Sequence, residues 1–333
     1  MFVSKNPKGV YYVFYNQPNG KRTCLSTGSK KKSEALKFLS EFKDHQKEIS
    51  EREFIPISLK EFRWEYLKYS ESFHTWKTTL TYKTTFNSMM KYFGEIQLID
   101  LTRKTIEEYI QTLIRKTSIY SGRKDLINIK ASLNWAVQNN YLINNPSQLI
   151  KRLKVPERLP LYYTREDFQK LIDVIDNQDI KDLVIFAVNT GLRQEELIHL
   201  QFRQVNFLDK SIILDNQNHI TKSKKIRTLP LNEKAFTIIN DRKKINDELI
   251  FTINNRLIQK DHLIHKFKKY VIKAGINSKL HFHSLRHTFA SWLVQGGVSI
   301  YHVSKLLGHA DIKTTEIYAH LSLTDLKNSL DIL

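Results

Sequence analysis

The sequence predicts a mixed, mainly helical chain with three parts: a small β-plus-α unit, a four-helix domain, and a larger α+β part. Three observations predict this fold class. Residues 10–28 combine aromatic and β-branched residues with a Pro-Asn-Gly turn signal, residues 55–150 carry four amphipathic helical patterns, and residues 160–333 mix helical patterns with strand-like runs. A chain of 333 residues is long enough for two or three domains with a sizeable core.

The first predicted domain, residues 1–50, is a β-sheet plus a helix. The run VYYVFYNQPNGKRTCLSTG indicates a strand, a turn and a second strand. A helix fits residues 33–49, with its apolar side chains on one face: Ala35, Phe38, Leu39 and Phe42. Basic residues flank the turn and the helix: Lys21, Arg22, Lys30, Lys31 and Lys32.

The second predicted domain, residues 55–150, is a compact bundle of helices. Ser58 and Glu61 have the spacing of a capping box at the start of the first helix, and Gly94 is placed to end the second. The spacing of the apolar residues is the ordinary one for a buried face, so we interpret these stripes as core. The four stripes begin at Leu59, Tyr82, Ile106 and Leu126.

A linker and a mixed α+β domain follow. Residues 145–162 contain three prolines and four basic residues, which places an interdomain linker at about 151–160. The third predicted domain is residues 160–333. Its predicted elements are helices at 165–176 and 180–190 and strands at 211–215 and 226–231.

The charge of the chain favours a polyanionic partner. The sequence has 53 Lys plus Arg against 34 Asp plus Glu, a formal net charge of +19, and the basic excess is present in all three predicted parts. Nucleic acid is the leading candidate for such a partner, with a long contact surface. The single cysteine, Cys24, excludes an internal disulfide, and the N-terminal residues have no apolar signal core. We therefore expect a cytoplasmic protein that does not cross a membrane.

The stretch LGHADIKTTEIYAH contains His309 and Tyr318, a histidine followed by a tyrosine nine residues later. A tyrosine that attacks a phosphodiester has definite chemical needs. Its phenol has a pKa of about 10, so the attack requires a base. Cations must already face the phosphate oxygens, because the transition state concentrates negative charge there, and arginine can grip two oxygens at once. The leaving sugar oxygen needs a proton.

The C-terminal part supplies each of these groups. Arg193 lies in NTGLRQEEL, where it follows a glycine turn and opens a helix, and Glu196 is on the same helical face. Lys222 lies in TKSKKIRTLPL, in a predicted hairpin loop. His283 and Arg286 are spaced i, i+3 in HFHSLRHTFA and share a helix face. Each residue alone is more often a surface or packing residue. Their occurrence together in this order indicates a catalytic set.

These motifs resemble those of the tyrosine recombinases, the phage integrase family. The resemblance runs through TGLRQEEL, TKSKKIRTLPL, HSLRHTFASWLVQGG and LLGHADIKTTEIYAH. The family pattern is Arg, Lys, His-x-x-Arg, His or Trp, and then Tyr, and every position of it is filled here. Glu195 is a small departure, since many members carry a small residue there.

The resemblance implies both a domain plan and a set of roles. Residues 1–50 correspond to an arm-binding domain, a three-stranded sheet plus a helix, and residues 55–150 to a core-binding domain. Tyr318 would form a 3′-phosphotyrosyl bond and release a 5′-hydroxyl. The other implied roles are phosphate binding by Arg193 and Arg286, proton donation by Lys222, a base or proton relay at His283, a hydrogen bond to the phosphate from His309, and a structural role for His287.

The covalent link conserves the energy of the phosphodiester, so no ATP, metal or other cofactor is expected. The sequence accordingly has no G-x-x-x-x-G-K-[ST] loop. The implied partners are double-stranded DNA, three further copies of the chain in a tetramer, a host DNA-bending protein and a directionality factor, all in the bacterial cytoplasm at the nucleoid. A leucine stripe near the end of the chain either docks on a neighbouring protomer or packs on its own domain: Leu323, Leu326, Leu330 and Leu333.

The expected function is integration or excision of a mobile element. Three alternatives remain open. A type IB topoisomerase shares the catalytic set, but the two N-terminal domains argue against it. A non-catalytic DNA-binding regulator would lack a catalytic residue, and none is missing here. A Xer-like housekeeping recombinase is disfavoured by the domain at residues 1–50.

Overall fold

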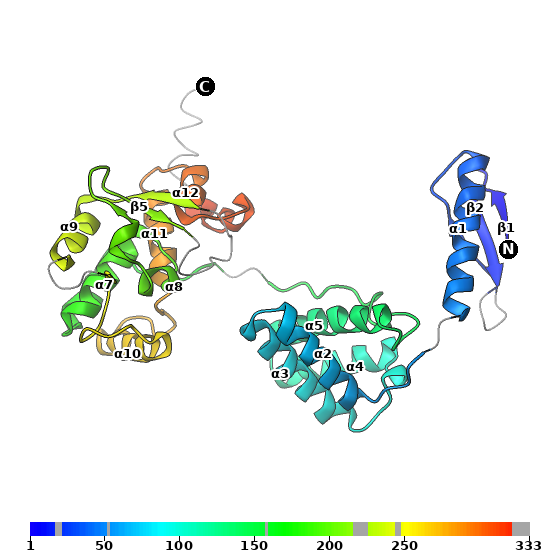
Figure 1. Ribbon diagram of the computed structural model, residues 1–333. Helices are drawn as coiled ribbons and strands as arrows, with labels where there is room; N and C mark the ends of the chain where they lie inside the picture. The colour runs from blue at the N-terminus through cyan, green and yellow to red at the C-terminus, as the bar shows by residue number, and fades with distance from the viewer. Residues whose placement is uncertain (17–21, 52–53, 157–158, 216–225, 244–247, 322–333) are drawn as a thin grey trace. The chain divides into compact units, whose positions relative to one another are not determined.

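The computed structural model describes the chain except for residues 17–21, 52–53, 157–158, 216–225, 244–247 and 322–333 (Figure 1). The chain divides into two compact units, Met1–Pro156 and Glu157–Leu333. Among the residues that the structure describes, no helix combines the length and the apolar character needed to cross a membrane.

The chain begins with a three-stranded antiparallel sheet in the order β1 (Phe2–Lys5), β2 (Tyr11–Asn16) and β3 (Arg22–Ser26), followed by α1 (Lys32–Glu51). α1 lies against the sheet (Figure 1). Local periodicity indicated β2, β3 and the helix, whereas β1 was implied only by the family resemblance. The predicted Pro-Asn-Gly turn lies outside the described residues.

Four helices form the next part: α2 (Leu59–Phe73), α3 (Trp76–Phe93), α4 (Arg103–Lys116) and α5 (Ile119–Gln138). A short turn of helix, η1 (Leu98–Asp100), precedes α4. The capping box is formed by Ser58 and Glu61, and Gly94 ends α3 with a φ of 70°. The predicted apolar stripes are the core, because the residues that begin them are all buried.

The second unit, Glu157–Leu333, combines a small antiparallel sheet with a larger set of helices. The sheet has the order β4 (Val205–Asn206), β5 (Ser211–Leu214) and β6 (Arg227–Pro230). The helical elements are α6 (Arg165–Val174), α7 (Gln178–Thr190), α8 (Gln194–Ile198), η2 (Phe202–Gln204), α9 (Glu233–Arg242), α10 (Lys260–Lys273), α11 (Ser284–Gln295), α12 (Ile300–Leu307), η3 (Ile312–Thr314) and η4 (Glu316–Leu321).

Two features of this unit position the candidate site. α11 packs against α7, α12 and η4, so it is buried on most of its circumference. β5 and β6 pair antiparallel, with Leu214 opposite Arg227, so Lys222 belongs to the segment that joins these two strands. Lys222 itself lies outside the described residues.

Candidate active site

Arg193 is held by the turn between α7 and α8. Gly191 ends α7 in the left-handed conformation, with a φ of 63°, and Arg193 is the N-cap residue of α8. The Arg193 backbone N–H donates to one carboxylate oxygen of Glu196 at 2.9 Å, and its Nη1 donates to the other at 2.8 Å. Its Nη2 donates to the carbonyl of Gly308 at 3.3 Å. The expected proximity of Glu196 to Arg193 therefore agrees with the observed contacts.

The buried Glu196 carboxylate is shared with a second arginine, Arg227 of β6. Arg227 donates from Nη2 to Oε2 of Glu196 at 2.8 Å and from Nη1 to Oε1 at 3.3 Å. Burial by itself raises the pKa of Glu196, but Arg227 and Arg193 together outweigh it and hold that pKa below its ordinary value. Glu196 therefore stays ionised at neutral pH and keeps two guanidinium groups beside each other.

Arg286 of α11 joins two backbone segments of this unit. Its Nη1 donates to the carbonyl of Gly191 at 2.7 Å and its Nη2 to the carbonyl of Leu307 at 2.6 Å. These bonds use two of the five N–H donors of the guanidinium group. The side chain is buried, and this burial, together with the charge of Arg193, lowers the pKa of Arg286 to about 9. Arg286 is therefore a cation at neutral pH, in a position where desolvation strengthens its attraction for an anion.

His309 follows the end of α12 at Gly308, which has a φ of 65°. The His309 Nδ1 lies 2.8 Å from the hydroxyl of the buried Thr315, which fixes the orientation of the ring. Burial and the charges of Arg286 and Arg193 lower the pKa of His309 to about 4. His309 is therefore a neutral imidazole at pH 7, and two of the three arginines that lower its pKa, Arg286 and Arg193, are predicted phosphate ligands.

Tyr318 is buried in η4, with only 2% of its surface exposed. Its ring packs in a cluster with Phe289, Val294 and Leu307. Its hydroxyl lies 2.6 Å from Nδ1 of His287 on α11. Burial raises the pKa of Tyr318 to about 12, although the charge of Arg286 acts in the opposite direction. The phenol is thus neutral, and a proton acceptor is needed before it can attack.

His283 lies at the N-terminal end of α11 and is exposed. Its ring centroid is 5.0 Å from that of His287, with the two rings nearly perpendicular. Five of the six predicted residues thus lie in one cluster: Arg193, His283, Arg286, His309 and Tyr318. The sixth, Lys222, lies outside the described residues.

Sequence reasoning missed two residues of this cluster. Arg227 is in the quoted TKSKKIRTLPL motif, yet nothing in its spacing shows that it contacts Glu196. His287 was expected to be structural, but it is the side chain that contacts the Tyr318 hydroxyl. Its only sequence signal is its position four residues after His283, one helical turn further along the same face. Glu195, the noted departure, pairs with Lys260 at 2.5 Å.

The cluster suits an anion, since two guanidinium groups, those of Arg193 and Arg227, share the single Glu196 carboxylate and the buried guanidinium of Arg286 adds a third positive charge. Among the residues that the structure describes, no group of His, Cys, Asp and Glu is arranged to hold a metal ion.

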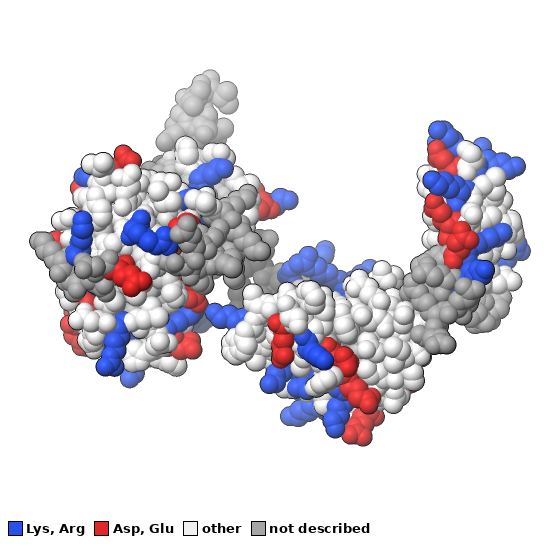
Figure 2. All heavy atoms as spheres, in the orientation of Figure 1, with Lys and Arg blue, Asp and Glu red and all other residues white. Residues whose placement is uncertain are grey.

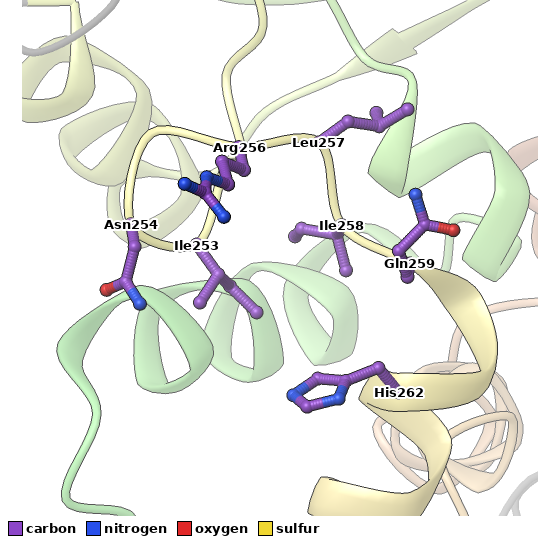
Figure 3. A pocket seen from close by; sticks show the side chains of 7 residues that line it. All are labelled: Ile253, Asn254, Arg256, Leu257, Ile258, Gln259 and His262. Atoms are coloured by element: carbon purple, nitrogen blue, oxygen red, sulfur yellow. The ribbon is translucent and has the colours of Figure 1, made fainter.

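A separate pocket of about 420 Å³ is lined by residues of the 253–259 loop and by His262 of α10 (Figure 3). That lining includes none of the six candidate catalytic residues.

Comparisons with known proteins agree on one family. The phage integrase family matches residues 162–324. The chain is 30% identical to a tyrosine recombinase of Pseudothermotoga lettingae, across 68% of this chain and 81% of that protein. It is 32% identical to tyrosine recombinase XerA of Pyrococcus furiosus, across 57% of this chain and 67% of that protein.

Two solved structures share the fold. A lambda integrase dimer bound to a COC′ core site has a TM-score of 0.68 and 16% identity, covering 95% of this chain and 93% of that one. A Tn1549 transposon integrase in complex with a circular intermediate DNA has a TM-score of 0.69 and 18% identity, covering 83% of this chain and 99% of that one.

The fold and the cluster around Tyr318 are those expected of an enzyme that exchanges DNA strands through a tyrosine. The chain belongs to the tyrosine recombinases of the phage integrase family. The predicted fold class, family and recombinase activity are therefore confirmed. The domain boundaries and the individual catalytic roles stay predictions.

Glu196 should make the stability of the catalytic unit sensitive to acid. Because its folded pKa is depressed, its contribution is fully present above the ordinary value of 4.5 and is lost as the pH falls through the lower folded pKa. At pH 7, Glu196→Gln should lower the free energy of unfolding by about 3 kcal/mol, since Arg193 and Arg227 lose a buried partner. This difference from wild type should shrink as the pH falls below the ordinary value of 4.5 and disappear once the pH is below the depressed folded pKa, where the wild-type carboxylate is also neutralised.

Urea unfolding of both proteins at pH 7, 5 and 3.5 measures this effect. The matched control is Glu233→Gln, because Glu233 pairs with Lys210 at 2.7 Å but is 79% exposed. It should change the free energy of unfolding by less than about 1 kcal/mol at any pH. A gap between wild type and Glu196→Gln that is constant with pH would contradict the assignment.

Proposed function

We propose that this chain is the recombinase of a mobile genetic element and that Tyr318 is its nucleophile. The observation that carries the proposal is that the Tyr318 hydroxyl contacts His287, the chain neighbour of Arg286 on α11, while Arg286 and Arg193 bind the successive carbonyls of Leu307 and Gly308, directly before His309. Such an arrangement supplies positive charge and a proton acceptor beside a phenol, which are the two needs of tyrosine attack on a phosphodiester.

The proposed reaction follows from these groups. Arg193 and Arg286 bind the non-bridging oxygens of the scissile phosphate, and each has N–H donors beyond those used in its protein contacts. His309 donates a further hydrogen bond to the phosphate. Tyr318 forms a 3′-phosphotyrosyl bond, while Lys222 protonates the leaving 5′-oxygen. His283 is the exposed end of the path by which the proton of the phenol leaves.

Residues 1–50 are proposed to be an arm-type DNA-binding domain. The side of the sheet occupied by Val13 faces α1, because Val13 is buried and the neighbouring Tyr15 ring lies 4.9 Å from Phe42 of α1. Because side chains alternate between the two sides of a strand, Phe14 and its cross-strand partners lie on the side of the sheet away from α1, here called the open side. On that side, Phe2 stacks on Phe14 at 5.3 Å and the Arg22 guanidinium lies 4.8 Å from the Phe2 ring.

Loss of Arg22 should weaken DNA binding by this domain in a salt-dependent way. Arg22→Ala removes one cation from the open face of the sheet, so the slope of log affinity against log salt should fall by about 1. The measurement is a salt titration of DNA binding with the full chain. Lys37→Ala is the matched control, because Lys37 lies on α1 and pairs there with Glu41. Equal slopes for Arg22→Ala and wild type would exclude this face from DNA contact.

The proposed assembly is a tetramer on two DNA duplexes. The lambda integrase tetramer bound to a Holliday junction shares the fold of this chain, with a TM-score of 0.66. Figure 2 shows Lys and Arg side chains on each part of the chain, which suits a long DNA contact surface. The leucine stripe proposed to dock on a neighbouring protomer, Leu323 to Leu333, lies outside the described residues. A host DNA-bending protein and a directionality factor complete the proposed set of partners.

A Xer-like housekeeping role is the second candidate function. The observation that favours it is the similarity to proteins named XerA, XerD and XerC, at 32%, 29% and 28% identity. The observation that favours the mobile-element role is the sheet-and-helix unit ahead of the four helices. The lambda integrase dimer matches 95% of this chain, so the shared fold extends into that unit.

Covalent capture tests the proposed function. The full chain is incubated with fragmented DNA of the source genome, denatured with SDS, and the ends of the protein-linked fragments are sequenced. Adducts at one short inverted repeat at the ends of an element support the mobile-element role, whereas adducts at a single chromosomal repeat outside any element support the Xer-like role. Adducts should form equally in EDTA, because arginines supply the charge that metals supply elsewhere. A strict magnesium requirement would contradict the proposed reaction.

A further inference from the structure

The hydroxyl of the proposed nucleophile contacts a residue to which the family pattern assigns no catalytic role. The hydroxyl of Tyr318 lies 2.6 Å from Nδ1 of His287, and the two ring centroids are 5.9 Å apart. A separation of 2.6 Å is at the short end of the range for a hydrogen bond. His283, which the sequence suggested as base or relay, lies one helical turn earlier, with its ring centroid 5.0 Å from that of His287.

We propose that His287 is the catalytic residue that takes the proton of Tyr318 during cleavage and returns it during rejoining. This inference rests on the proposed function. As the Tyr318 oxygen bonds to phosphorus, its O–H bond breaks and the proton passes to Nδ1 of His287. The bond from phosphorus to the 5′-oxygen breaks in the same reaction, and that oxygen takes a proton from the acid. Rejoining runs the two transfers in reverse.

The surroundings of His287 suit a base that acts only when DNA is present. His287 is half-buried, and this burial lowers its pKa. The charged or titratable groups around it act in the same direction: His283, His281, Arg286 and His309. The imidazole is therefore neutral in the free protein and able to accept a proton. Tyr318 faces it from η4 and completes this environment. A phosphate bound by Arg193 and Arg286 neutralises part of the positive field and so makes protonation of His287 easier.

The three side chains form a path from the interior to solvent. Tyr318 is 2% exposed, His287 is intermediate and His283 is exposed. A proton accepted at His287 can therefore leave past His283, which gives His283 the relay role. The proposed role also requires a particular tautomer, since an Nδ1 that accepts must be unprotonated and the ring proton must sit on Nε2.

Two variants and an altered tyrosine test the role in the reaction. Single-turnover cleavage is measured on a duplex with the captured site, nicked so that cleavage is irreversible. His287→Ala and His287→Asn should each slow cleavage by about 10²- to 10⁴-fold, the range for loss of a general base. A ring-fluorinated tyrosine at position 318 has a more acidic phenol, so it should raise the cleavage rate of each His287 variant at least about tenfold. His265→Ala, an exposed histidine on α10, should cleave at the wild-type rate.

His287→Asn protects the test against misfolding, because its amide can keep a hydrogen bond to Tyr318 without accepting the proton. Wild-type rates in both variants would overturn the proposal. Slow cleavage that fluorination does not restore would reduce His287 to a structural role. The same test is applied to His283→Ala. If the fluorinated tyrosine restores cleavage in His283→Ala but not in His287→Ala, the base is His283.

A measurement without DNA separates this inference from the proposed function. Nitrogen-15 NMR of histidine-labelled protein should show His287 neutral at pH 7, with an unprotonated Nδ1 whose signal shifts in Tyr318→Phe. A protonated Nδ1 would overturn the proposal even if wild type forms DNA adducts. If the protein shows the expected tautomer but never forms DNA adducts, the contact between His287 and Tyr318 exists without catalysis. That result would contradict the proposed function as well as the role of His287.

Discussion

Replacing Tyr318 by phenylalanine is expected to abolish the covalent protein–DNA adduct completely and to leave DNA binding unchanged. The substitution removes only the hydroxyl, which is the proposed attacking atom. The ring keeps its packing against Phe289, Val294 and Leu307, so η4 should stay in place. Loss of the hydrogen bond to the half-buried His287 should cost about 1 kcal/mol of stability, too little to unfold the unit. SDS-resistant adducts and gel shifts, measured side by side, separate the two effects.

Tyr301→Phe is the matched control for this prediction. Tyr301 lies on α12 in the same unit but is 56% exposed, so its hydroxyl has no proposed part in the reaction. That variant should form adducts at the wild-type level. If Tyr318→Phe still forms adducts, the nucleophile is another residue. If wild type binds DNA tightly but forms no adduct on any fragment, the chain is better explained as a DNA-binding regulator.

Substitution of Arg286 should have the second-largest effect. Arg286→Lys keeps a positive charge but cannot hold the carbonyls of Gly191 and Leu307 and a phosphate with one planar group. We expect cleavage to fall by about 10²- to 10³-fold, the range for removing one preorganised donor from a developing charge. Arg286→Ala should be slower still, because it also leaves both carbonyls without their arginine donor.

The rate of cleavage at saturating protein and the thermal midpoint together distinguish the two contributions of Arg286. Arg165→Lys is the control, because Arg165 lies in the same unit and stacks on Trp292 at 3.5 Å but is not a proposed phosphate ligand. It should lose less than twofold in rate. An Arg286→Lys protein that is less stable yet cleaves at the wild-type rate would show that Arg286 only supports the backbone.

Several helices could be predicted from local chemistry alone. The Ser58–Glu61 capping box, the glycine that ends α3 and the apolar stripes of the four helices are all encoded within one or two turns of sequence. β5 and β6 were predicted from their β-branched and apolar runs and are observed at Ser211–Leu214 and Arg227–Pro230. β1 and β4 were not, because short edge strands become strands only through their pairing with β2 and β5.

The residue types of the candidate site could also be predicted from sequence. A tyrosine, two arginines, two histidines and a lysine occur in the order that phosphodiester chemistry and the family pattern require. The pairing of Arg193 with Glu196 was predictable as well, because three residues on a helix bring two side chains to one face.

The sequence by itself thus determined the family, the helical patterns, the basic charge and the set of reactive residues. Only the tertiary structure decided which histidine lies against Tyr318 and which arginine shares Glu196. His287 and Tyr318 are 31 residues apart, and Arg227 and Glu196 are also 31 apart. Contacts over such separations depend on how α11 packs against η4 and how β6 lies beside α8. That packing depends on the whole core, so no local spacing encodes it.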